Sequence, residues 1–350
     1  MPPARLVVTL PGLLAASDPG AAPAAPHLAR LLAAAGVPLV EPDGTAAALA
    51  RVYGIERQLD WPLAAIRLVA LGTDPAEGWW IAADPVTLVA GRDDVRLTGA
   101  VTDLEADEAG ALIATINAHF APDALEFSAP RPDAWFVRAP APAAIATCPL
   151  ATATGRTLRE QLPVGTDAGT WRRWQNEIQM LLHEHPVNAA RERRGLPLVN
   201  SVWFWGGGTC PPRSGTPIVT FAGDDGIAAA LAAHHGAPAR VLASPSAGAL
   251  AGVLATGPTA AAQRSEATTV VIALDAPLDL ATVERDWAAP AWAALLRGAL
   301  ARVTLIADGD GRTVVWTARR PGGWQRIAAR LRGPDLRALL AAAGPGSAAE

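Results

Sequence analysis

The sequence predicts a mixed α/β protein with a mostly parallel sheet, helices on both faces of that sheet, and a small inserted α+β subdomain. Three observations lead to this fold class. The apolar run Leu6–Leu10, the break at Pro11-Gly12 and the helical pattern from Pro26 follow the strand–loop–helix order that opens α/β sheets. The run Val199–Trp205 is apolar on both faces, as a central parallel strand should be. Between them, residues 76–144 are typical of hairpins around one helix.

Apolar periodicity and helix-boundary residues place the elements of the core. Leu28, Leu31 and Leu32 share one face of the first helix, which ends near Gly36. The later strands are expected at Ile218–Phe221, Val270–Leu274 and Val303–Ile306, and the last pairs with Thr313–Thr317 across the turn Asp308–Gly311. The later helices are expected at Thr170–His183 with Asp167 as N-cap, at Val187–Arg194 before Gly195, at Ile227–His234 and at Thr282–Arg297.

The inserted subdomain has a different texture. Its strands are expected at Trp79–Val89, Val95–Leu97, Leu125–Phe127 and Trp135–Val137, with turns at Asp93-Asp94 and Pro130–Asp133, and its helix at Asp107–Phe120. The Pro/Ala stretch Ala139–Ala144 is typical of a linker. Residues 76–144 are therefore assigned to the inserted subdomain, and residues 1–75 and 145–350 to the α/β core.

Composition limits the classes of function. The 350 residues carry a net charge of −4, which argues against a nucleic-acid partner. The chain has no lysine, which excludes a Walker-type phosphate loop and a Schiff-base lysine. Pro, Gly, Arg or Asp interrupts each long apolar run, so no membrane span is expected. Cys148 and Cys210 are expected as reduced thiols, and Pro11-Gly12 breaks the first apolar run too early for a signal peptide, so we expect a cytoplasmic protein.

The triple glycine Gly206-Gly207-Gly208 after an apolar strand is the most conspicuous motif. Glycines at the carboxyl end of a strand let backbone N–H groups approach an anion, but a tight turn with positive φ values explains the same residues. The spacing is not that of the dinucleotide fingerprint. Trp203 and Trp205 share the strand face that leads into the glycines, so they either wall a pocket or pack in the core.

Candidate metal ligands are few. His183 and His185 are of the right type, but they share a face only on a strand and no carboxylate follows at a zinc spacing. Asp224 and Asp225 lie between a strand and a helix, where capping competes with metal binding. Asp275 ends a strand with no histidine nearby. These residues are weak candidates, and no resident metal or other cofactor is expected.

Arg191 belongs to a basic turn that lies close in sequence to Asn188 and Asn200. The arginine fork holds carboxylates and phosphates through two N–H groups, so this stretch is suited to a small phosphorylated or carboxylate ligand. A solvated helix face with cations in its last turn explains the same residues.

One stretch resembles a known family. His185-Pro186-Val187-Asn188, then Arg191, Gly195 and the segment Asn200–Gly208, is similar to the HPVN…R…G…N-x-x-W-x-W-G-x-G stretch of archaeal-type cofactor-independent phosphoglycerate mutases. It resembles even more closely the RpfE-type regulatory proteins of proteobacteria. The resemblance implies a bacterial protein with an alkaline-phosphatase-like core. The candidate ligand-binding residues are then His185, Asn188, Arg191, Asn200, Trp203, Trp205, Gly206, Gly207 and Gly208.

The sequence departs from that family where its metals bind. The mutases have an Asp-Gly pair after the first strand, a Ser nucleophile, and late Asp and His ligands. Here Leu10-Pro11-Gly12 ends the first strand, and no histidine follows His235. A two-metal phosphoryl-transfer site needs several carboxylates and imidazoles together. The leading hypothesis is therefore a pseudoenzyme, a non-catalytic regulatory or ligand-binding relative with no assigned catalytic residue.

Two alternatives stay open at this point. The first is an active phosphomutase or phosphatase that holds Mn or Zn at a rearranged site of Asp224, Asp225, Asp275 and His185. The second is an interaction module whose tryptophan-rich surface docks a protein partner; the chain has twelve tryptophans.

Overall fold

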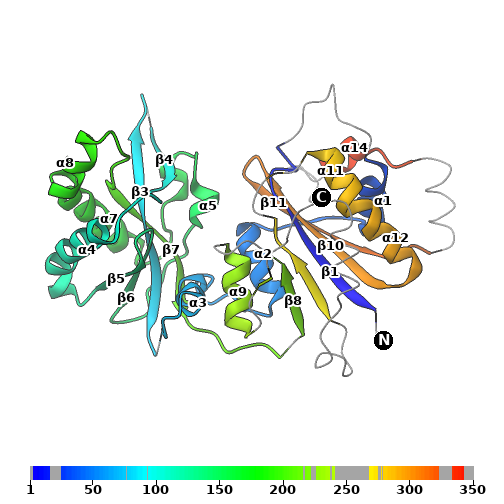
Figure 1. Ribbon diagram of the computed structural model, residues 1–350, viewed down its shortest axis with the longest axis horizontal. Coiled ribbons are helices and arrows are strands. Elements are labelled where there is room, and N and C mark those ends of the chain that lie inside the picture. The colour runs from blue at the N-terminus through cyan, green and yellow to red at the C-terminus, as the bar shows by residue number, and fades with distance from the viewer. Residues whose placement is uncertain are drawn as a thin grey trace. The chain divides into compact units, whose positions relative to one another are not determined.

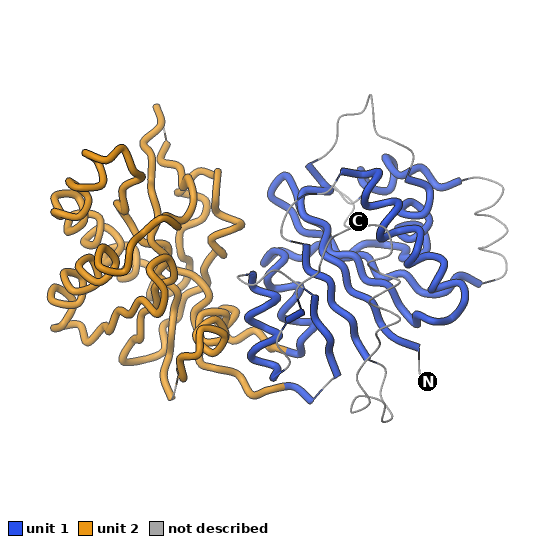
Figure 2. The backbone as a smooth tube through the Cα atoms, in the orientation of Figure 1, with its two compact units in different colours: residues 1–54, 214–350 blue, residues 55–213 orange. Residues whose placement is uncertain are grey.

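The computed structural model describes residues 3–15, 25–75, 77–92, 94–215, 217–221, 226–236, 239–240, 268–274, 277, 279–322 and 333–342. The chain forms two compact units, Met1–Gly54 with Ser214–Glu350 (unit 1) and Ile55–Arg213 (unit 2) (Figure 2). Unit 2 is larger than the expected subdomain 76–144, because flanking segments on both sides pack into it. Among the described residues, none of the helices has the length and apolar character that a membrane crossing requires.

Unit 1 contains a six-stranded sheet in the order β2-β11-β10-β1-β9-β8. Strands β10, β1, β9 and β8 run parallel, whereas β11 is antiparallel to β10 and β2 is antiparallel to β11. The strand bounds are β1 Ala4–Leu10, β2 Leu39–Val40, β8 Ile218–Phe221, β9 Thr269–Ile272, β10 Leu300–Gly309 and β11 Arg312–Arg319. The expected mostly parallel sheet is confirmed.

Helices cover both faces of this sheet (Figure 1). On one face, Leu28, Leu31 and Leu32 of the first helix share an apolar core with Leu6 and Val8 of β1. The bounds in unit 1 are α1 Pro26–Ala35, α2 Gly44–Val52, α9 Ile227–His235, α11 Leu280–Thr282, a π-helical turn Val283–Ala288, α12 Ala289–Arg297 and α14 Leu336–Ala341. Helices α2 and α9 lie on the face opposite α1 and α12 (Figure 1).

The late hairpin forms as the sequence predicts. Asp310 and Gly311 have φ values of 47° and 79°, and two successive positive φ values define the turn that matches the twist of two-residue hairpins. The single helix expected over Thr282–Arg297 is instead divided by the π-helical turn. Pro290 in the first turn of α12 lacks an N–H group, so the regular hydrogen-bond ladder cannot continue through it.

Unit 2 contains a five-stranded antiparallel sheet around the long strand β3. This strand pairs with β4, β6 and β7, and β5 pairs with β6. The strand bounds are β3 Trp79–Ala90, β4 Val95–Ala100, β5 Glu126–Arg131, β6 Ala134–Ala139 and β7 Ser201–Thr209. The helix bounds are α3 Leu63–Ala70, α4 Ala106–Phe120, a 3₁₀ turn Ala121–Asp123, α5 Leu150–Ala153, α6 Leu158–Gln161, α7 Ala168–His183 and α8 Pro186–Arg193.

Strand β7 corrects the expectation of a central parallel strand. It is antiparallel to β3 and belongs to unit 2. It is apolar on both faces because Phe204 packs against Trp171 of α7, with ring centroids 5.0 Å apart, while the alternate side chains face α3. An apolar pattern on both faces of a strand indicates that a layer covers each face. It does not indicate whether the neighbouring strand is parallel or antiparallel.

Two smaller expectations also need correction. Asp167 precedes α7, but its carboxylate accepts a hydrogen bond from Ala144 N at 2.7 Å and does not cap the helix. The turn expected at Pro130–Asp133 is shorter, because β5 continues to Arg131.

Candidate functional site

The candidate ligand-binding residues lie at α8, which precedes β7, and along β7 itself. Asn200 precedes this strand, and Gly206–Gly208 lie near its other end. At about 3.3 Å of rise per residue, Asn200 and Gly207 are roughly 20 Å apart. The motif that is continuous in sequence therefore divides into two separate sets of contacts, and both belong to unit 2.

Arg191, at the first end, is fully enclosed. Its side chain has no exposed surface, and Nη1 and Nη2 contact Glu108 at 2.6 Å and Asp103 at 2.5 Å. Its Nε donates to Pro197 O at 2.8 Å. Partial burial alone would raise the pKa of Glu108, but hydrogen bonds from Glu105 N and Arg191, with the charge of Arg194, lower it overall. Arg191 thus ties α8 to the start of α4.

Asn188 and Asn200 bridge backbone segments. Asn188 Nδ2 donates to Leu182 O and Val199 O, and its Oδ1 accepts from Val199 N. Asn200 makes the same kind of pair with Leu88, accepting from N at 2.7 Å and donating to O at 2.8 Å. These amides fasten α8 and β3 to the chain that enters β7.

His185 caps α8 through its ring. Val187 N donates to Nδ1 at 3.2 Å, so the neutral ring carries its proton on Nε2. Nε2 lies 3.0 Å from Thr115 Oγ1, whose own proton goes to Ala111 O. Burial lowers the pKa of His185, which favours this neutral form. Both ring nitrogens are therefore engaged within unit 2.

The two tryptophans of β7 are buried and hydrogen-bonded. Trp203 Nε1 donates to Cys148 O at 2.8 Å, and Trp205 Nε1 donates to Asp84 Oδ2 at 2.7 Å. Asp84 also pairs with Arg67, whose guanidinium carbon lies 4.8 Å from the Trp205 ring centroid. The side chains pack in the core, as one of the two sequence interpretations expects.

The backbone N–H groups of Gly206 and Gly207 donate hydrogen bonds to side chains of the protein itself. Gly206 N donates to Thr147 Oγ1 at 2.9 Å, and Gly207 N donates to Asp60 Oδ2 at 3.3 Å. Only Gly206 has a positive φ, of 73°. A Cβ at Gly207 would lie 2.6 Å from the Trp79 ring, and one at Gly208 would lie 2.6 Å from Pro62. Close packing and an internal carboxylate account for these glycines.

Asp60 is a buried carboxylate that the sequence reasoning missed. Besides Gly207 N it accepts hydrogen bonds from Trp61 N, Thr147 N and Thr147 Oγ1. Burial raises its pKa despite these donors. No local pattern marks Asp60, because its partners Thr147 and Gly207 lie far away in the sequence. The polar groups of the residues along β7 already have hydrogen-bond partners within the protein. A ligand-binding role for these residues stays a prediction.

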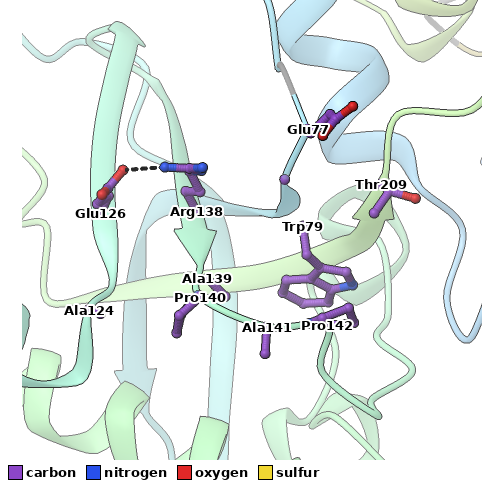
Figure 3. A pocket seen from close by; sticks show the side chains of 11 residues that line it. Glu77, Trp79, Ala124, Glu126, Arg138, Ala139, Pro140, Ala141, Pro142 and Thr209 are labelled. Atoms are coloured by element: carbon purple, nitrogen blue, oxygen red, sulfur yellow. Dashed lines mark hydrogen bonds and ion pairs between the residues drawn. The ribbon is translucent and has the colours of Figure 1, made fainter.

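A pocket of about 390 Å³ lies at the edge of the sheet of unit 2 where β7 ends (Figure 3). The ends of four strands meet there. Its lining residues are Glu77, Gly78, Trp79, Ala124, Glu126, Arg138, Ala139, Pro140, Ala141, Pro142 and Thr209. The sequence reasoning missed this pocket, although Thr209 directly follows the glycine stretch.

In unit 1, Asp308 of β10 accepts two hydrogen bonds near the carboxyl end of the parallel strand β1. Gly12 N donates to Asp308 Oδ1 at 2.8 Å, and Thr45 Oγ1 donates to Asp308 Oδ2 at 2.8 Å. A Cβ at Gly12 would lie 3.1 Å from Pro277. The two carboxylate oxygens of Asp308 therefore tie the turn after β1 and the first turn of α2 to the end of β10.

The residues described at this strand end do not fit a two-metal centre. Leu10, Pro11 and Gly12 offer no side-chain ligand, and Asp308 is engaged on both oxygens. Over the described ranges, His, Cys, Asp and Glu nowhere gather in a group of three or more that could hold a metal ion. Asp224, Asp225 and Asp275 lie outside the described residues. His183 is the last residue of α7, and His185 precedes α8 as its N-cap.

A comparison with family models finds no match. The 2,3-bisphosphoglycerate-independent phosphoglycerate mutase of Methanothrix thermoacetophila is 39% identical to this chain over 57 residues. This match supports a relation to the cofactor-independent phosphoglycerate mutases. It covers 16% of this chain and only 14% of the length of that relative.

A comparison with solved structures finds chains of low identity. The cofactor-independent phosphoglycerate mutase of Thermoplasma acidophilum has 15% identity and a TM-score of 0.40, with 91% of this chain and 90% of that chain covered. A protein of Pyrococcus horikoshii has 14% identity and a TM-score of 0.48 over the full length of both chains.

Proposed function

We propose that this chain is a non-catalytic regulatory or ligand-binding relative of the cofactor-independent phosphoglycerate mutases, with an alkaline-phosphatase-like core and a cytoplasmic location. The relation rests on the matched segment of the Methanothrix mutase. The resemblance to RpfE-type regulatory proteins, carried by the stretch from His185 to Gly208, favours a bacterial regulatory protein over an enzyme.

The engagement of Asp308 is the observation that carries the proposal. In open α/β sheets, ligands bind beyond the carboxyl ends of the strands. At this position Asp308 accepts from Gly12 N and Thr45 Oγ1, so its carboxylate fastens the first loop to the sheet. Phosphoryl transfer between two metals needs several carboxylates and imidazoles that point at the ions. The described strand ends of unit 1 do not supply them.

The two alternatives meet specific obstacles. A rearranged site that includes His185 would have to displace Val187 N or Thr115 from its ring. A tryptophan-rich docking surface needs exposed indoles, and every tryptophan in the described ranges is buried or half-buried. The non-catalytic proposal meets neither obstacle.

A direct assay tests the proposal. Purified full-length protein, supplied with Mn²⁺ or Zn²⁺, should not interconvert 3-phosphoglycerate and 2-phosphoglycerate, while an active mutase does so under the same conditions. Elemental analysis should find metal far below one equivalent. Turnover that follows bound metal stoichiometrically would overturn the proposal.

A variant of Asp308 sharpens the test. Asp308→Asn should lower thermal stability, because Gly12 N and Thr45 Oγ1 lose a charged acceptor, and it should leave metal content and the absence of turnover unchanged. A variant that folds normally but loses measurable mutase activity would show that Asp308 serves catalysis.

A further inference from the structure

We propose that the pocket at the edge of unit 2 binds a small zwitterion, an α-amino acid with an apolar side chain. The inference rests on the ligand-binding half of the proposed function and names the class of ligand. The pocket volume of about 390 Å³ lies within the usual range for small-molecule sites. The lining of the pocket has a cationic part, an anionic part and an apolar floor. These three parts determine which class of small molecule fits.

Arg138 supplies the cationic part. Its Nη1 contacts Glu126 Oε2 at 3.3 Å, and the two side chains are 44% and 69% exposed. An ion pair this exposed is weak, so the guanidinium can exchange this partner for a ligand carboxylate at little cost. The remaining N–H groups of the fork suit a planar carboxylate, which they bind through two hydrogen bonds.

Gly78 leaves room for this guanidinium. A Cβ on Gly78 would lie 3.1 Å from Arg138 Nε and 3.2 Å from Trp80 Nε1. Glycine therefore lets the arginine lie close over the backbone at the start of β3. Trp80 Nε1 is held in turn by Pro75 O at 2.7 Å.

Glu77 supplies the anionic part. Its carboxylate makes no hydrogen bond or ion pair with the other described residues, and in Figure 3 it stands apart from the Arg138–Glu126 pair. A ligand ammonium group can contact Glu77 while its carboxylate contacts Arg138. With Glu77, Glu126 and Arg138 the lining has an excess of one negative charge. This balance disfavours a phosphate dianion.

Trp79, Pro140, Ala141 and Pro142 form the apolar floor (Figure 3). The Trp79 ring contacts Trp171, with ring centroids 5.6 Å apart, and packs closely against the backbone at Gly207. A rigid aromatic and proline surface favours an apolar side chain, because no protein side chain has to be ordered on binding. The three parts together match a zwitterion with an apolar side chain.

Calorimetry on the full-length protein tests the proposal with three compounds that share the leucine side chain and differ only in their charged groups. Leucine should bind. Leucinamide, which lacks the carboxylate, and N-acetyl-leucine, which lacks the ammonium group, should each bind at least about tenfold more weakly, the loss expected for one charged contact. Equal binding of the three compounds, preference for either singly charged compound, or no binding of leucine or phenylalanine overturns the proposal.

Variants locate the site. Arg138→Gln and Glu77→Gln should each weaken leucine binding about tenfold, and Arg138→Gln should also remove the discrimination against leucinamide. Arg96→Gln and Glu56→Gln change exposed charges of unit 2 outside the pocket and should leave binding unchanged. Leucine binding unaffected by both pocket variants would place the site elsewhere. Failure of this test leaves the mutase assay unaffected, and mutase turnover would not by itself produce leucine binding.

Discussion

Tyr53 offers the clearest measurement at the scale of one residue, because it is the only tyrosine of the chain. Its hydroxyl bonds to Thr220 Oγ1, and its ring meets His235 edge to face at 5.9 Å between centroids. Burial raises the pKa of Tyr53 to about 12, while the hydrogen bond to Thr220 acts in the opposite direction. We expect tyrosinate absorbance to stay absent in the folded protein until the pH approaches 12, and to develop near pH 10 in denaturant.

The same shift links Tyr53 to stability at alkaline pH. The neutral phenol is favoured in the folded state, so between pH 10 and about 12 the unfolded state binds fewer protons and stability falls as the pH rises. Below pH 10 this contribution is fully present. Tyr53→Phe should remove this part of the pH dependence, as measured by denaturant unfolding. A normal titration near pH 10 in the folded protein would contradict the burial of the hydroxyl.

At the scale of an element, β7 owes its position to close backbone packing. Gly207 lies where a Cβ would be 2.6 Å from Trp79 Cζ2 and 2.9 Å from Cη2, and the Trp79 ring is itself held by Trp171. Gly207→Ala should therefore lower the free energy of unfolding by about 1–3 kcal/mol, the usual cost of overpacking a core. Thermal and urea unfolding measure this loss.

Gly110 provides the matched control. It lies inside α4, with open space where a Cβ would be added. Gly110→Ala should stabilise the protein by about 0.5–1 kcal/mol, because alanine loses less backbone freedom than glycine in a helix. Equal effects of the two substitutions would mean that the Trp79 contact does not constrain β7.

The sequence predicts an element correctly where the residues at its ends are themselves helix-boundary or turn residues. Pro26 and Gly36 bracket α1, and Asp310-Gly311 forms the turn between β10 and β11. The partners of β7 have no such signal. Its apolar residues fit any sheet with two covering layers, so neither the antiparallel pairing with β3 nor its place in unit 2 could be read from them.

The candidate site illustrates the same limit more strongly. The sequence marks Arg191 as a candidate, but its partners Asp103 and Glu108 lie more than eighty positions away in the sequence. A fork of donors predicts an anionic partner, and it does not say whether that anion is a ligand or the protein's own carboxylate. The pocket was missed because its residues come from the ends of four strands, which only the fold brings together.

At the scale of the whole molecule, the two units differ in how the chain builds them. Unit 2 is one continuous segment, whereas unit 1 needs residues from both ends of the chain. The apolar cluster around Trp135, Trp171 and Phe204 lies entirely within Ile55–Arg213. A continuous segment with its own sheet and its own core satisfies the requirements for independent folding. Unit 2 should therefore be stable without unit 1.

Two fragments test this expectation. The fragment 55–213 should unfold cooperatively in urea, as followed by circular dichroism and tryptophan fluorescence. The fragment 76–144, the subdomain that the sequence predicts, should not fold, because it lacks β7 and α7 and so loses Trp171 and Phe204 from the core. A cooperative transition in the short fragment would contradict this account, since the antiparallel sheet would then be stable without β7. The two fragments differ by residues 55–75 and 145–213, which contain α3, α5, α6, α7, α8 and β7. The comparison therefore measures how much these flanking segments together add to the stability of unit 2.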